Sequence, residues 1–475
     1  MKNRTRRQKA IIRRRIFIAS LSVILAAVIA LLSIVVVSVV NNIGDNSSSS
    51  IVESSVEVKP EPKTATIINT GDILVHTPVL GGAKTADGNY DFSAFFIESE
   101  KYFKAADYAT VNFEVTLGGN EKQRFDGYPM FNTPDSILDT IKNSGIDMVT
   151  TANNHCYDTG YDGLIRTVQQ MKLNGIDFIG TKEFETDPTY LVKDINGIKI
   201  GMVAFTYENA AAAGRKSING NLVRQEANNL INSFSYERID EFYTQAQSVV
   251  DGMKNDGAEA FVFYMHWGEE YQLTPNKWQK AIAQKLCNMG VDVIVGAHPH
   301  VVQPIELLHS EDSQNTTVCI YSMGNSISNQ RQELMDSCPS GHTEDGVLFS
   351  YTFTKDSDGV VSLTGVDVIP TWVNKYPGGS GYQYTMYPLE TANMANDYQF
   401  GAAALRKAMA SFERTKKLVA PGLTECQKYL GCKVRFEDIV TENSSNQSAS
   451  GDTSSKEQTS STNSSKEQES SNASN

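Results

Sequence analysis

Positive charge is the first thing that this sequence lacks. Its 475 residues carry a formal net charge of −13. Eight of the 42 Lys and Arg residues lie between Lys2 and Arg15, so the rest of the chain is still more acidic. Proteins that bind nucleic acid neutralise its phosphates with clustered Lys and Arg. The charge balance therefore argues against nucleic acid as a partner.

Cysteine is also scarce, and none directly follows the N-terminal apolar segment, where a lipoprotein would carry its anchor. Six Cys residues are present in the whole chain. An even number outside the cell permits disulfides. Cys287 and Cys319 lie in apolar runs and are interpreted as buried thiols, whereas Cys426 and Cys432 are close enough in sequence to pair.

One long apolar run lies near the N-terminus. Residues 16–40 contain no charged side chain, and they follow a basic segment, residues 1–15, that has no acidic residue. At about 1.5 Å per residue the run spans roughly 37 Å, more than the hydrocarbon thickness of about 30 Å. We therefore expect a single transmembrane helix at 16–40, with a cytoplasmic N-terminus and an extracellular remainder. The alternative is a signal peptide cleaved near Gly44, which would leave the domain outside as well.

Two polar segments bound the part of the chain that can fold. Residues 41–63 include four consecutive serines and predict a flexible linker. Residues 443–475 consist mostly of Ser, Asn, Gln, Lys and Glu, a composition that predicts a disordered tail. Between them we expect a main domain at 64–370 and a C-terminal extension at 371–442 that packs on it.

Short apolar runs alternate with amphipathic stretches through the main domain. The predicted strands are 65–69, 108–113, 148–151, 198–205, 260–265, 291–295, 317–321 and 346–353. The predicted helices are 136–144, 160–173, 239–255 and 275–289. This alternation predicts an α/β (or α+β) fold. Residues 372–392, which carry Gly, Pro and Tyr, are interpreted as irregular surface, with one or two helices between 394 and 430.

Chemically reactive side chains gather where the predicted strands end, the edge at which open α/β sheets bind ligands. The clusters are G-D-I-L-V-H (71–76), N-F-E (112–114), T-A-N-N-H-C-Y-D-T-G (151–160), H-W-G-E-E-Y (266–271) and G-A-H-P-H (296–300). Five of the seven His residues fall in them. Asn-rich turns also cap helices, and a single loop His is usually solvated. Histidines concentrated beside carboxylates instead predict a metal or phosphate site.

These clusters, together with Y-S-M-G-N at 321–325, occur in the order found in the poly-γ-glutamate capsule biosynthesis (CapA) family, which the chain resembles over about residues 65–370. That family in turn resembles calcineurin-like metallophosphoesterases. The resemblance implies two facing β-sheets flanked by helices. It also implies two divalent metal ions, of which Mn, Fe and Zn are the candidates.

By this resemblance each site residue has an expected role. Asp72 and His300 would bind one metal and Asn154, His266 and His298 the other, with Glu114 as the bridging carboxylate. His155 would protonate the leaving group, with Asp158 orienting it. The residues expected to support the site or to contact substrate are Asn112, Trp267, Glu270, Tyr271, Gln303 and Asn325.

The sequence departs from the metallophosphoesterase pattern at three points. His76 follows Asp72 by four residues instead of two, which leaves it an open candidate for a ligand. Glu114 replaces an Asp and reaches one methylene further. Asp158 lies three residues after His155 instead of one. Trp267 and Tyr271 could equally be packing residues.

Three functions fit these observations. The first is a metal-dependent hydrolase, membrane-anchored, that acts on an anionic surface polymer or its phosphorylated precursor. The second is a non-catalytic factor for capsule assembly or export, which would keep the fold and contact membrane capsule-synthesis proteins. The third is an amide hydrolase that cuts γ-glutamyl links.

Overall fold

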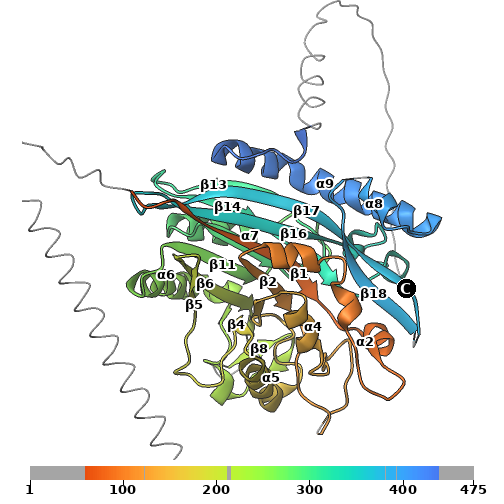
Figure 1. The fold of residues 1–475 in the computed structure, drawn as a ribbon. Helices are drawn as coiled ribbons and strands as arrows, with labels where there is room; N and C mark the ends of the chain where they lie inside the picture. The colour runs from red at the N-terminus through yellow and green to blue at the C-terminus, as the bar shows by residue number, and fades with distance from the viewer. Residues whose placement is uncertain (1–58, 122, 211–214, 380, 392, 438–475) are drawn as a thin grey trace, which may run out of the picture. The chain divides into compact units, whose positions relative to one another are not determined.

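The computed structural model describes residues 59–437 apart from residues 122, 211–214, 380 and 392 (Figure 1). The expected basic segment at 1–15, transmembrane helix at 16–40, most of the linker and the tail at 443–475 lie outside the described residues. Within the described part, no helix combines the length and the apolar character needed to cross a bilayer.

Two β-sheets form the centre of the described domain. The first sheet has the spatial order β18 (Gly381–Pro388), β17 (Val361–Gly378), β16 (Asp345–Lys355), β1 (Lys63–Ile73), β2 (Tyr108–Phe113), β3 (Met148–Thr150) and β4 (Asp177–Ile179), and β15 (Asn325–Ile327) also pairs with β1. The second sheet has the order β10 (Ser233–Phe234), β6 (Ile198–Tyr207), β11 (Ala260–His266), β12 (Val293–Ala297), β14 (Thr316–Ile320) and β13 (Ile305–His309), and β5 (Leu191–Ile195) also pairs with β6. A small sheet consists of β7 (Asn209–Ala210), β8 (Lys216–Ile218) and β9 (Asn221–Leu222).

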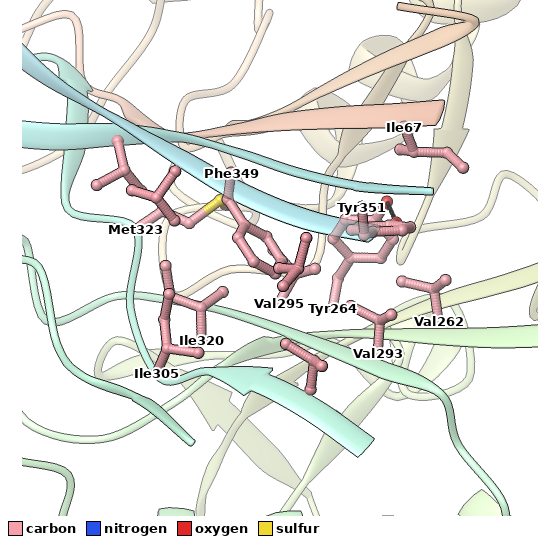
Figure 2. Close-up of a cluster of buried hydrophobic side chains, with 14 of the residues drawn as sticks. Ile67, Val262, Tyr264, Val293, Val295, Ile305, Ile320, Met323, Phe349 and Tyr351 are labelled. Carbon is pink, nitrogen blue, oxygen red and sulfur yellow. Dashed lines mark hydrogen bonds between the residues drawn. The ribbon is translucent and has the colours of Figure 1, made fainter. Parts of the chain in front are cut away.

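The main hydrophobic core lies between the first and second sheets. Successive strand residues point to opposite faces, so Val262 and Tyr264 of β11 face this core while Phe261 and Phe263 pack on the other side of the sheet. Figure 2 shows side chains from both sheets that face this core. Those labelled are Ile67, Val262, Tyr264, Val293, Val295, Ile305, Ile320, Met323, Phe349 and Tyr351.

Helices cover the outer faces of both sheets. The helices are α2 (Thr77–Ala83), α3 (Glu100–Ala105), α4 (Ile137–Asn143), α5 (Gly160–Asn174), α6 (Ile239–Asn255), α7 (Lys277–Asn288), α8 (Met394–Asp397) and α9 (Ala402–Leu430), with 3-10 turns at Ser93–Phe95, Gln225–Ala227, Tyr236–Arg238, Gln332–Leu334 and His342–Glu344. Apolar residues of α2, α3 and α4 pack on the first sheet, and those of α6 and α7 pack on the second. The structure is therefore a mixed α/β fold, as predicted.

Helix α9 closes one side of the sandwich and contacts both β17 and β13 (Figure 1). Its residues Phe412, Val419 and Leu423 are buried in the same core that the two sheets share. Residues from the predicted C-terminal extension thus complete the main core. The expected start of that extension, residue 371, lies inside β17.

The prediction of irregular surface at 372–392 was wrong. Residues up to Gly378 continue β17, and β18 returns antiparallel to it from Gly381. The glycines that suggested irregular structure lie at the turn between these two strands. Tyr384 and Met386 of β18 are buried against the helices on the outer face of the first sheet, which explains why the segment is ordered.

Cys426 and Cys432, which are close enough in sequence to pair, do not form a disulfide, because both are free thiols. Cys426 lies on the buried face of α9 and packs into the main core, whereas Cys432 follows the helix end at Gly431. Cys287 and Cys319 are buried thiols, as predicted.

Candidate metal centre

Carboxylate and imidazole side chains meet where parallel strands of the two sheets end. Asp72 lies on β1, Glu114 directly follows β2, His266 ends β11, and His298 and His300 follow β12. Each of the five side chains is buried, with at most 4% of its surface exposed. The position of Asp72 depends on Gly71, because a Cβ at residue 71 would lie 1.9 Å from the carbonyl oxygen of Gly324.

Glu114 belongs to two overlapping groups of potential metal ligands. One consists of Glu114, His298 and His300, and the other of Asp72, Glu114 and His266. In each group the ligand atoms lie within 4.8 Å of one another. Glu114 Oε1 is 3.5 Å from His266 Nε2 and 3.7 Å from His300 Nε2. The geometry therefore gives Glu114 the central place that a bridging carboxylate would need.

The electrostatics of the cluster suit a cation. Burial, and then the charges of Asp72 and Glu270, raise the pKa of Glu114 well above its usual value. Burial and the neighbouring imidazoles lower the pKa of His266 and of His298, so both rings are neutral and able to bind metal. Burial opposes charge on His300 as well, but its hydrogen bond to Asp72 raises its pKa.

Two buried atoms in the cluster have no hydrogen-bond partner in the described residues, namely Glu114 Oε1 and His298 Nδ1. Leaving such atoms unsatisfied costs free energy. His298 and His300 also have positive φ angles of 97° and 55°, which are strained for residues other than glycine and are typical of functional sites. The donor set of imidazoles and carboxylates, with these free atoms, fits divalent cations such as Zn²⁺, Mn²⁺ or Fe²⁺.

Two asparagines connect the candidate ligands. Asn112 Nδ2 donates to Asp72 Oδ1 (2.8 Å) and to Glu114 Oε2 (3.1 Å). His266 Nε2 donates to Asn154 Oδ1 (2.8 Å), so these two expected ligands face the same point. Asn112 is itself held by Thr150, whose hydroxyl donates to Asn112 Oδ1 (3.0 Å).

A buried His–Asp pair lies beside the cluster. His155 Nδ1 donates to Asp158 Oδ2 (2.7 Å), and the Phe131 backbone N–H donates to the same oxygen (2.7 Å). The Phe131 ring also meets the His155 ring edge to face at 4.7 Å. Burial raises the pKa of Asp158 despite its bond to His155. Through its hydrogen bond, Asp158 fixes the orientation of the His155 ring and keeps the proton of His155 on Nδ1.

His76 lies next to the cluster but in neither ligand group. Its Nδ1 accepts a hydrogen bond from the Asn329 backbone N–H (3.3 Å). Its ring packs edge to face on Phe131 at 5.3 Å. Burial and the charge of His300 lower its pKa to about 3. The four-residue spacing places His76 after the strand, at the start of α2, rather than on the face of Asp72.

The residues predicted to shape the substrate groove separate into two kinds. Trp267 is fully buried, and its indole N–H donates to the Tyr321 carbonyl (2.9 Å), so it is a core residue and not part of a groove. Glu270 is exposed. Tyr271 has a positive φ of 65°, and its ring centroid lies 6.3 Å from that of His300.

Gln303 and Asn325 hold the loops around the cluster. Gln303 Nε2 donates to the Gln272 carbonyl (2.7 Å), and Gln303 Oε1 accepts from Gln279 Nε2 (2.8 Å). Asn325 Nδ2 donates to the carbonyl of His300 (3.2 Å). Both side chains are fully buried and therefore support backbone that carries the candidate ligands.

Sequence reasoning missed three residues that contact the site. Phe131 lies in a loop with no metal-binding residue nearby in sequence. Tyr207 ends β6, and its ring lies 4.9 Å from that of His298. Asn153 was recognised within its motif only, yet its Nδ2 donates to the Phe113 carbonyl (2.9 Å) beside Glu114. Only the position of Asn153 in the cluster at 151–160 offered a signal.

Comparisons with known proteins identify relatives of this chain. The model of the family described as "Bacterial capsule synthesis protein PGA_cap" matches residues 66–330. The PGA biosynthesis protein CapA of Bacillus subtilis (strain 168) is 27% identical over 273 residues, which are 57% of this chain and 63% of that protein. The chain thus matches slightly under two thirds of that relative's length.

The Capsule biosynthesis protein CapA of Bacillus anthracis is 26% identical over 313 residues, which are 65% of this chain and 68% of that protein. Among solved structures, the Haemophilus influenzae NAD nucleotidase (NadN) aligns at 12% identity with a TM-score of 0.39, covering 82% of this chain and 68% of that one. The family match covers more than half of the chain and includes every candidate metal ligand. This chain therefore belongs to the PGA_cap family of bacterial capsule synthesis proteins.

Proposed function

We propose that this protein is a membrane-anchored, metal-dependent hydrolase of the phosphoesterase type that acts in the biosynthesis of a capsule or other envelope polymer. The observation that supports it best is the pair of overlapping buried ligand groups that share Glu114. The membrane anchor rests on the apolar run at 16–40 alone.

In this proposal the cluster holds two divalent ions. Asp72, His266, His298 and His300 would hold them with Asn154, and Glu114 would lie between them. When bound, such a pair of ions activates a water molecule and stabilises the negative charge of the transition state. The buried carboxylates offset part of the ions' positive charge, and the remainder would favour an anionic substrate.

His155 is the proposed proton donor to the leaving group. Its Nδ1 proton is held by Asp158 Oδ2, which leaves Nε2 free to exchange a proton with substrate. The negative charge of Asp158 stabilises the imidazolium form that donates this proton. General acid help of this kind contributes about 10²–10⁴-fold to the rate.

The proposed substrates are a poly-γ-glutamate polymer or a phosphorylated precursor of an envelope polymer. The names of the two CapA relatives support a capsule context. The same side chains would also suit cleavage of a γ-glutamyl amide, because activated water and a proton donor serve both reactions. Membrane proteins of capsule synthesis are the proposed partners.

The test compares metal content and hydrolysis of bis(4-nitrophenyl) phosphate in the wild-type chain, in His298→Ala and in His309→Ala. His309 is an exposed histidine at the end of β13 and serves as the control. We expect His298→Ala to lose both metal and hydrolysis while His309→Ala keeps them. A wild-type chain that is folded, metal-free and inert would refute the hydrolase and support a non-catalytic assembly factor.

A further inference from the structure

Lys375 is a cation without a carboxylate partner near the candidate metal centre. It lies on β17 and is only partly exposed. Its Nζ donates to Asn329 Oδ1 (3.0 Å), and no acidic side chain of the described residues lies within ion-pair distance. Burial, and then the charge of Arg331, lower its pKa. A nearby anion stabilises the charged form of such a lysine.

The neighbouring cations differ from Lys375 because each has an acidic partner. Arg331 binds Glu344 (2.6 Å) in the interior. Lys407 binds Glu333 (3.1 Å) at the surface. The positive charge of Lys375 is therefore the one in this group that is left for a ligand from outside the described residues.

Asn329 links Lys375 to the centre. Its side-chain oxygen accepts from Lys375, and its backbone N–H donates to His76 Nδ1 (3.3 Å). The next residue, Gln330, donates from its Nε2 to the Tyr271 hydroxyl (3.3 Å). The Tyr271 ring centroid lies 6.3 Å from that of His300, and the His76 ring packs on Phe131, which also contacts His155. Lys375 is thus one residue away from side chains that border the ligand cluster.

The strand register places Lys375 at the same end of the first sheet as Asp72. Thr70 of β1 pairs with Leu348 of β16, and Gly346 of β16 pairs with Thr371 of β17. Residues of β17 after Thr371 therefore extend past the carboxyl end of β1, the end that carries Asp72. The Nζ of Lys375 also lies 4.6 Å from the centroid of the Tyr382 ring, an exposed aromatic surface on β18.

We propose that Lys375, with Asn329 and Tyr382, forms a substrate subsite that binds a carboxylate of the polymer beside the bond to be cleaved. This inference rests on the proposed function. One unpaired cation balances one negative charge, which favours a carboxylate over a phosphate dianion. Two of the three subsite residues, Lys375 and Tyr382, lie on β17 and β18, beyond the residues that the family model matches, whereas Asn329 lies within them.

The experiment measures binding by isothermal titration calorimetry with the metal-free, full-length chain, so that a metal-dependent hydrolase cannot cleave the peptides during the titration. The probes are a γ-linked pentaglutamate, the same peptide with its α-carboxylates amidated, and inorganic phosphate. The variants are Lys375→Met, Asn329→Asp and, as control, Lys101→Met. Lys101 also lies over a tyrosine ring (4.9 Å from Tyr102) without an ion pair among the described residues, but on α3, which precedes the amino end of β2.

We expect wild type and Lys101→Met to prefer the charged peptide to its amide. Lys375→Met should weaken binding of the charged peptide on the order of tenfold, because it removes one charged hydrogen bond. Asn329→Asp should weaken it as well, because an internal carboxylate would then pair with Lys375. Urea midpoints close to that of wild type would show that the variants are folded.

Unchanged peptide binding in folded Lys375→Met and Asn329→Asp would overturn the subsite, as would a wild type that does not distinguish the peptide from its amide. Loss of phosphate binding without loss of peptide binding in Lys375→Met would overturn the choice of carboxylate. Binding is measured without turnover, so the hydrolase proposal is judged separately by the metal content and activity of His298→Ala.

Discussion

Replacing Gly422 by alanine tests how α9 is held against the second sheet. Gly422 lies within α9, and a Cβ there would be 1.8 Å from the carbonyl oxygen of Ile305 and 2.6 Å from its carbonyl carbon. Since side-chain carbons do not approach closer than 3.0 Å, the helix or β13 would have to move by more than about 1 Å. The buried neighbours Val419 and Leu423 would move with it.

The expected change in the free energy of unfolding is opposite in sign to the change that helix propensity alone would give. Alanine in place of glycine stabilises a helix interior by about 1 kcal/mol. A gap of 0.5–1 Å already forfeits roughly a quarter to a half of each dispersion contact. Overpacking of this kind costs about 1–3 kcal/mol. Because the propensity gain offsets about 1 kcal/mol of this cost, we expect Gly422→Ala to lower the free energy of unfolding by up to about 2 kcal/mol.

The assay is urea unfolding followed by circular dichroism, with Gly81→Ala in α2 as the matched control. A Cβ at Gly81 would meet no atom within 4 Å, so this change should leave stability unchanged or raise it by up to about 1 kcal/mol. A Gly422→Ala protein as stable as wild type, with the control behaving as stated, would refute the close approach of α9 to β13.

Three further predictions concern the buried charges. Asp158→Asn should lower the kcat of the proposed hydrolase by about 10²–10⁴-fold at an unchanged melting temperature, because the amide no longer holds the proton on His155 Nδ1; an unchanged kcat would remove His155 as the donor. In EDTA, the folding stability should fall as the pH rises above 4.5, the usual pKa of Glu, because Glu114 keeps its proton in the folded state but loses it on unfolding. Melting temperatures measured between pH 5 and 7 would show this fall, and Glu114→Gln should make it smaller. Arg331→Met should cost at most about 3–5 kcal/mol, because buried Glu344 would keep only Lys407 (3.4 Å) as a cationic partner, and adding Glu344→Gln should recover part of that loss in urea unfolding.

The elements predicted from sequence are those with strong apolar periodicity. Each predicted strand between residues 65 and 353 corresponds to a strand of the structure, because its apolar run is buried between layers. Residues 372–392 were misjudged because Gly378, Gly379 and Gly381 lie at the turn between β17 and β18, and glycines of this kind usually mark irregular structure. Pro421 and Gly422 would suggest a helix end, yet α9 continues through them, since packing on both sheets outweighs local propensity.

The candidate site could be predicted only as far as its residues occur in compact motifs. Asp72, Glu114 and the clustered histidines were found because the carboxyl ends of parallel strands lie at the same edge of a sheet. Lys375 and Tyr207 lie far from these motifs in sequence, so only the strand register reveals them. Trp267 shares a motif with His266, but successive strand residues face opposite sides, which puts its ring in the core.

The placement of β1 has a consequence for how the chain is made. β1 lies between β2, which follows it closely, and β16, whose Phe349 accepts a hydrogen bond from Asn69 across a separation of 280 residues. At translation rates of about 5–20 residues per second, roughly 15–60 seconds pass between the synthesis of β1 and the synthesis of β16. During that interval one edge of a central strand has unsatisfied backbone groups, which can pair with other chains. Vectorial synthesis of this fold should therefore depend on a factor that shields β1 until the C-terminal third emerges.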